Sequence, residues 1–167
     1  MRCHVWKVLL LLPLLVALFY DQPALAAPAD KVEAGQRCPV CGMFVAKYDN
    51  WITQARDLKA NKTWFFDGVK DLLVFWFDPQ AYGGPGRDAL GELWVKDYYT
   101  LKWIAAREGV YVIGSEVYGP MGHEFIPFAG RKAAESFLHD HKGTAIVTFA
   151  EITPAMVASM REGQRMR

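Results

Sequence analysis

Three sulfur-bearing side chains lie close together in the stretch "CPVCGM". Cys38, Cys41 and Met43 fall within six consecutive positions. Two cysteines at this spacing could form a disulfide, act as a redox-active thiol pair or supply ligands to a metal ion. A disulfide would close a very short loop and would remove little chain entropy from the unfolded state, so a structural crosslink is the least useful of the three.

The redox and metal interpretations require different surroundings. A redox-active pair of this spacing ends a strand and begins a helix, but a strand-like alternation starts here at Phe44. Thiolate and thioether together are soft ligands that select Cu(I), whereas zinc prefers four Cys or His ligands. Gly42 would allow the backbone to turn so that the Cys41 and Met43 sulfurs face one point. Copper is therefore favoured, and the redox pair stays open.

A second sulfur-bearing loop, "GPMGH", strengthens the metal interpretation. Met121 is flanked by Gly119, Pro120 and Gly122, and His123 adds an imidazole. A lone methionine is more often core filler than a ligand. A rigid loop rich in glycine and proline is seldom a place where a methionine packs into a core. The two loops together predict a copper site if the fold brings them close to each other.

The other titratable residues receive structural interpretations. His139 and His141 are expected at the surface or at a helix end, Asp67 as a helix N-cap, and Glu116 and Glu124 as solvated charges near strands. The sequence shows no nucleophile and base pairing, no phosphate-binding loop and no nucleotide fingerprint. An enzyme is therefore disfavoured.

The N-terminal segment 1–26 is typical of a secretory signal peptide. Arg2 and Lys7 flank the start of an apolar run over 8–18, and small residues precede Ala27. The run is too short and too interrupted for a good membrane anchor, so membrane association is expected only if the segment is retained. No cysteine follows the run, so lipid attachment is not predicted. The chain is therefore expected to be exported.

Composition limits the class of partner. The chain has 19 basic and 18 acidic residues, and loss of 1–26 would leave a formally neutral remainder. Nucleic acid is therefore an unexpected partner. The remainder is long enough for one domain with its own core. The expected organisation is a lead-in over 27–37, a domain over 38–153, and a C-terminal helix and tail over 154–167.

Local patterns predict alternating strands and helices. Strands are expected at 44–48, 51–58, 63–66, 90–99, 110–115, 124–128 and 145–149, and helices over 69–78, over 131–141 and from Pro154. The first two strands are expected to form a hairpin around Asp49 and Asn50. Asp67 and Thr153 are expected to cap the first and last helices. Residues 99–107 fit either a strand or a helix.

The chain also repeats itself. Five residues recur 62 positions later: Phe66, Gly68, Lys70, Phe75 and Asp78 return as Phe128, Gly130, Lys132, Phe137 and Asp140. Each set lies where a strand is followed by a helix. The predicted fold is therefore α+β, with two pseudo-symmetric ββαβ modules, about 38–98 and 108–150, in one compact domain. Such a pair could bring "CGM" and "GPMGH" to a common cleft.

At these residues the sequence resembles the NosL proteins, which are copper-binding accessory factors for nitrous oxide reductase. The resemblance runs from about Cys38 to Thr153, through "CPVCGMFVAKY", "FFDGVKDLLVF", "VKDYYTLKWIAA", "YVIGSEVYGPMGHEFIPF" and the helix before "DHKG". The family is similar in having two ββαβ units. Many of its members are lipoproteins, and this chain departs from them by lacking a cysteine at the cleavage site.

The resemblance implies a periplasmic protein that binds one Cu(I) and delivers it to apo nitrous oxide reductase or its copper-loading machinery. By the same resemblance, Cys41 and Met121 would be the principal ligands, and Met43 and His123 would complete or guard the site. Cys38 is less secure, because the family motif needs only the second cysteine. Two alternatives stay open: a thiol-disulfide oxidoreductase that uses Cys38 and Cys41, and a metal-free module that binds a partner.

Overall fold

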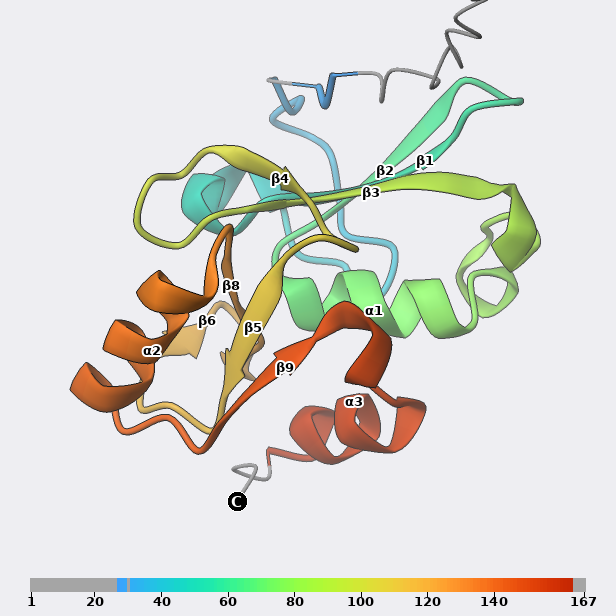
Figure 1. Ribbon diagram of the computed structural model, residues 1–167. Helices are drawn as coiled ribbons and strands as arrows, with labels where there is room; N and C mark the ends of the chain where they lie inside the picture. Colours follow the sequence, from blue (N-terminus) through green and yellow to red (C-terminus); the bar gives the residue numbers. More distant parts are fainter. Residues whose placement is uncertain (1–26, 30, 164–167) are drawn as a thin grey trace, which may run out of the picture.

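The computed structural model describes residues 27–29 and 31–163 (Figure 1). The predicted signal peptide and the end of the predicted tail lie outside the described residues. Within this range the chain combines α-helices with antiparallel sheets, as the α+β prediction required. No helix among the described residues has the length and apolar character needed to cross a bilayer.

The first sheet has four antiparallel strands in the order β2-β1-β3-β4. Its strands are β1 (Thr53–Asp57), β2 (Lys62–Phe66), β3 (Leu90–Lys96) and β4 (Trp103–Ala105). Helix α1 (Val69–Phe77) connects β2 to β3 and is buried along nearly its whole length. Figure 1 shows why: the sheet lies on one side of α1, and α3 (Pro154–Arg161) packs on another.

The second sheet has three antiparallel strands in the order β8-β5-β9. Its strands are β5 (Val110–Ile113), β8 (Ile126–Phe128) and β9 (Ala145–Thr148), and α2 (Arg131–Asp140) packs on it. A small hairpin, β6 (Tyr118–Gly119) and β7 (Gly122–His123), is inserted between β5 and β8. This hairpin is paired with neither of the larger sheets.

The two halves share an order of elements and a pattern of strand pairing. In each, the first strand is central, the second pairs beside it, and the strand after the helix returns to its other side. Phe66 and Phe128 end the second strands, and Gly68 and Gly130 come directly before the helices. The predicted ββαβ order is therefore present twice, with β4 added to the first sheet. Pseudo-symmetry between the two halves in space stays a prediction.

The predicted strand over 44–48 is wrong. Val45–Lys47 and Asp49–Trp51 form short 3₁₀ turns, and β1 pairs with β2 instead. The alternating pattern does not form a strand because Phe44 pairs with Arg37 and the chain then enters a 3₁₀ turn that buries Val45. The segment predicted as a lead-in also contacts the first sheet, since Gln54 exchanges two hydrogen bonds with the backbone of Ala29.

The later elements agree better with prediction. The undecided stretch contains β4, whereas the β6–β7 hairpin lies where only a loop was expected. The remaining strands and helices start within about two residues of the expected positions. Thr153 caps α3 as predicted, because its hydroxyl accepts a hydrogen bond from Met156 N at 3.3 Å. Asp67 does not cap α1: the N-cap position is Gly68, which has no side chain to accept the bond.

Candidate metal site

The two cysteines lie on a tight turn. Gly42 N donates to Cys38 O at 2.9 Å, and Cys38 N donates to Met43 O at 2.9 Å. Gly42 has φ +80, a left-handed conformation that favours glycine. Cys41 therefore sits in a tight turn and not in an extended strand. Cys38 is 1% exposed and belongs to the main core, while Cys41 is half-buried nearer the surface.

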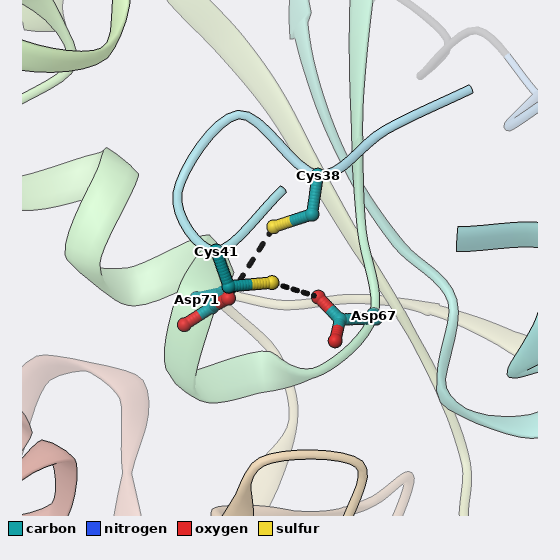
Figure 2. Close-up of side chains that lie close together, drawn as sticks. All are labelled: Cys38, Cys41, Asp67 and Asp71. Atoms are coloured by element: carbon teal, nitrogen blue, oxygen red, sulfur yellow. Dashed lines mark hydrogen bonds between the residues drawn. The ribbon is translucent and has the colours of Figure 1, made fainter. Parts of the chain in front are cut away.

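Two aspartates, one just before α1 and one in its first turn, face the cysteines. Cys38 Sγ donates to Asp71 Oδ2 at 3.3 Å, and Cys41 Sγ donates to Asp67 Oδ1 at 3.2 Å. Figure 2 shows both sulfurs directed at the two carboxylates. One potential ligand atom from each of the four residues lies within 4.8 Å of the others. The arrangement is a compact cluster that could hold a metal ion.

Sequence reasoning missed both aspartates. Asp67 was assigned to a cap, and Asp71 was not singled out. The signal that could have found them is the spacing in "DGVKD", because residues four apart at a helix start lie on one side of it. Asp67 also has a buried Oδ2 without a hydrogen-bond partner among the described residues. A buried carboxylate oxygen of this kind is often explained by an ion or a proton.

Burial controls the protonation of this cluster. Desolvation raises the pKa of the Cys41 thiol to about 12, and the neighbouring Asp71 and Asp67 raise it as well. The more deeply buried Cys38 has its pKa raised still further by desolvation and by Asp71. Burial also raises the pKa of Asp71. Without a metal ion both sulfurs are therefore protonated thiols, and binding a metal there must release protons.

Met121 reaches the same place from the other half of the chain. It lies at the turn of the β6–β7 hairpin and is 47% exposed. Cys41 and Met121 both line an open recess of about 260 Å³, together with Val40, Lys70, Asp71 and Arg161. The fold thus brings the two principal ligands of the sequence hypothesis to one recess. Their binding of copper stays a prediction.

The other predicted ligands are placed less directly. Neither His123 nor Met43 is among the described residues that line the recess. The His123 ring stacks on Tyr118, with centroids 4.8 Å apart, and Met43 contributes its backbone carbonyl to the cysteine turn. Cys38 lies behind Cys41 with its sulfur on Asp71. The roles of these three residues at the metal stay predictions.

The environments predicted for four other titratable residues can now be compared with the structure: one prediction is wrong and three are confirmed. Glu124 was expected in solvent but is 3% exposed. It lies beside the N-terminus of α1, where backbone N–H groups replace water as its partners. Glu116 is exposed and pairs with Lys142 at 2.8 Å. His139 is an exposed neighbour of Asp140, and His141 N donates to Phe137 O at the end of α2.

Comparison with known proteins decides the family. Residues 28–157 match the family model described as NosL. The chain belongs to the NosL family. A curated relative, the copper-binding lipoprotein NosL of Stutzerimonas stutzeri, is 28% identical over 137 residues, which cover 75% of this chain and 68% of the relative.

The fold resembles that of a solved NosL structure. The crystal structure of the copper chaperone NosL from Shewanella denitrificans has a TM-score of 0.62 at 26% identity and covers 77% of this chain and 99% of its own. The solution NMR structure of apo-NosL from Achromobacter cycloclastes is 28% identical, with a TM-score of 0.47, and covers 63% of this chain and 87% of its own.

In this NosL chain the candidate ligands lie at two depths. Cys38 and Asp67 are buried at the base of the cluster, while Cys41 and Met121 face the open recess. The carboxylates of Asp71 and Asp67 accept hydrogen bonds from the two thiols. The candidate site therefore combines a buried base with an accessible rim.

Proposed function

We propose that this NosL-family protein is an exported Cu(I) carrier that binds one Cu(I) and delivers it to apo nitrous oxide reductase or its copper-loading machinery. The main support is the shared recess of Cys41 and Met121, because a thiolate and a thioether form a soft donor pair suited to Cu(I). The copper-binding names of the NosL relatives support the cargo.

The geometry supports a site that loads and unloads from one side. On loading, Cys41 Sγ loses its proton and becomes the charged ligand, and the Asp67 carboxylate, which accepts its hydrogen bond at 3.2 Å, can take up that proton. Met121 supplies a neutral thioether from an exposed turn. A weak thioether bond at the rim is the first that a partner's ligand can replace, so transfer proceeds by stepwise exchange without a free copper ion.

The binding part of the proposal is tested by anaerobic Cu(I) titration against a competing chelator. The expected result is one Cu(I) per chain, with affinity lost or greatly weakened in Cys41→Ser and reduced in Met121→Leu. Met156→Leu is the matched control, because Met156 lies on α3, packs against the core and is not among the described residues that line the recess. Full affinity in both Cys41→Ser and Met121→Leu would remove the assignment of the site.

The delivery part needs its own experiment. In one arm, a membrane that passes chelated copper but no protein separates the Cu(I)-loaded protein from apo nitrous oxide reductase. In the other arm, the two proteins are mixed directly. Delivery predicts copper uptake only in direct contact, and slower uptake from Met121→Leu. Equal uptake in both arms would mean that the enzyme collects released copper and does not receive it from this protein.

The rival proposal, a thiol-disulfide oxidoreductase, is disfavoured by the thiols themselves. A nucleophilic cysteine needs a lowered pKa, whereas burial raises the pKa of both Cys38 and Cys41. Disulfide exchange with a model substrate, in the absence of copper, distinguishes the two functions. The metal-free partner-binding module is distinguished by its failure to take up Cu(I) under reducing, anaerobic conditions.

Location in the periplasm belongs to the same proposal. It is supported by the signal-like segment 1–26 and by a relative that is named a lipoprotein. Fractionation of cells that make the full chain, with mass measurement of the recovered protein, tests it. A protein recovered from the periplasm and shortened by 26 residues is the expected result. Recovery of the full-length chain from the cytoplasm would contradict the proposal.

A further inference from the structure

Lys70 joins the two halves of the molecule at the metal recess. It lies in the first turn of α1 and is 3% exposed. Its Nζ donates to Met121 O at 2.6 Å and to His123 O at 2.9 Å. A buried amine costs free energy unless its donors are used, and here both named acceptors are backbone carbonyls of the β6–β7 hairpin. Lys70 therefore binds the hairpin that carries Met121.

Glu124 forms the second half of this connection. It follows β7 directly, and its Oε1 accepts from Lys70 N at 2.6 Å and from Phe125 N at 2.9 Å. It thus occupies the N-terminus of α1, where free N–H groups and the helix dipole favour a carboxylate. Burial raises the pKa of Glu124 to about 8, and the Lys70 charge opposes that rise. The chain after Met121 is therefore held by the same helix that carries Asp71.

Two glycines make room for Glu124. A Cβ atom on Gly68 would collide with Glu124 Oε2, and one on Gly119 would lie 3.1 Å from Glu124 Cγ. Gly68 has φ −179, an extended conformation open to any residue, so the glycine is needed for space and not for backbone freedom. The glycine before the helix and the glycine at the hairpin therefore serve one buried side chain.

The internal repeat gives a natural comparison for these residues. Lys132 and Gly130, the counterparts of Lys70 and Gly68, are exposed, and a Cβ on Gly130 would meet nothing within 4 Å. The counterparts of Asp67 and Asp71 are Ala129 and Ala133. The buried lysine and the two clustered aspartates are thus present in the first half, and their counterparts in the second half are an exposed lysine and two alanines. A lysine needed only to build a ββαβ unit would be buried in both.

We propose that Lys70 and Glu124 are positioning residues that hold the β6–β7 hairpin so that the Met121 thioether faces Cys41 across the recess. The hairpin has two residues in each strand and is paired with neither larger sheet, so its own ladder gives it little stability. Lys70 acts on copper through Met121 and not as a ligand. The inference rests on the proposed function, in which Met121 binds Cu(I).

A double-mutant cycle tests the inference. Cu(I) affinity is measured by chelator competition for the wild type, Lys70→Leu, Met121→Leu and the double variant. Leucine is chosen because Lys70 lines the recess and leucine adds no sulfur there. Lys70→Leu is expected to weaken binding roughly tenfold alone and to have almost no further effect when Met121 is already Leu. Copper X-ray absorption should show one fewer sulfur neighbour in Lys70→Leu. Lys132→Leu is the matched control and is expected to retain full affinity.

A second pair of variants keeps the test decisive if Lys70→Leu does not fold. Gly68→Ala displaces the Glu124 side chain and leaves Lys70 in place, whereas Gly130→Ala makes the same change at the open counterpart. The inference is supported if Gly68→Ala weakens Cu(I) binding and Gly130→Ala does not, and if the effect of Gly68→Ala disappears in the Met121→Leu background. Equal affinity in the two glycine variants overturns it.

The outcomes separate the inference from the function on which it rests. If Met121→Leu weakens binding but Lys70→Leu adds an independent loss in that background, Lys70 does not act through Met121. That result overturns the inference and leaves the copper site intact. If Met121→Leu retains full affinity, the ligand assignment fails, and the positioning role fails with it.

Discussion

At the scale of single residues, the protonated thiols make copper binding a competition with protons. The pKa of Cys41 is raised to about 12 and that of Cys38 further still, so both sulfurs carry protons throughout the neutral range. Each thiolate that binds Cu(I) therefore releases one proton. The apparent Cu(I) affinity must therefore rise with pH, because protons compete with copper for the thiolates. The slope of the logarithm of this affinity against pH gives the number of thiols that become ligands.

The prediction is a rise of about tenfold in apparent Cu(I) affinity per pH unit for each bound thiolate between pH 6 and 9. Chelator competition at a series of pH values, corrected for the chelator's own protonation, measures the slope. Cys38→Ser is the informative variant: if Cys38 binds with Cys41, the slope falls from two protons to one. A flat profile in the wild type would show that neither thiol loses a proton on binding.

At the scale of elements, the four clustered side chains are positioned by the short cysteine turn and by the start of α1. The turn depends on Gly42, whose φ of +80 is strained for any residue with a Cβ. Gly42→Ala is expected to destabilise the turn by about 1 kcal/mol and to weaken Cu(I) binding, because Cys41 shifts relative to Asp67. Urea unfolding and Cu(I) titration measure the two effects.

Gly86→Ala is the matched control for that turn. Gly86 is also exposed, has φ −59 and offers open space to a Cβ, so alanine fits there. The control should retain both stability and affinity. If Gly42→Ala and Gly86→Ala behave alike, the left-handed turn is not what holds Cys41 in place.

The elements also show what the sequence could and could not reveal. Helical spacing and the repeat located α1, α2 and the strand before each, because these patterns are local and each half uses them. The prediction of a strand over 44–48 was wrong because Phe44 pairs with Arg37, a partner that the alternating pattern alone does not identify. Asp67 and Asp71 escaped notice because only the folded turn brings Cys38 and Cys41 against the start of α1.

At the scale of the whole molecule, the candidate site lies where the two ββαβ halves and α3 meet. The cysteine turn and its aspartates come from the first half, the Met121 hairpin from the second, and Arg161 from α3. This arrangement follows from the shared core that buries α1 against both the first sheet and α3. Copper affinity and global stability are therefore coupled through the residues that cross between the halves.

Glu124 is the clearest case of that coupling, because its burial raises its pKa from 4.5 to about 8. The folded protein binds the Glu124 proton more tightly than the unfolded chain does, so this group favours folding most below pH 4.5. Its contribution is lost as pH rises from 4.5 through about 8. Urea unfolding should show the wild type losing a few kcal/mol relative to Glu124→Gln across this window. Glu116→Gln changes an exposed carboxylate and is the control, so its free energy of unfolding should vary with pH as that of the wild type does. If the wild type and Glu124→Gln instead gave parallel plots of unfolding free energy against pH, Glu124 would not be a buried, protonated carboxyl group at neutral pH.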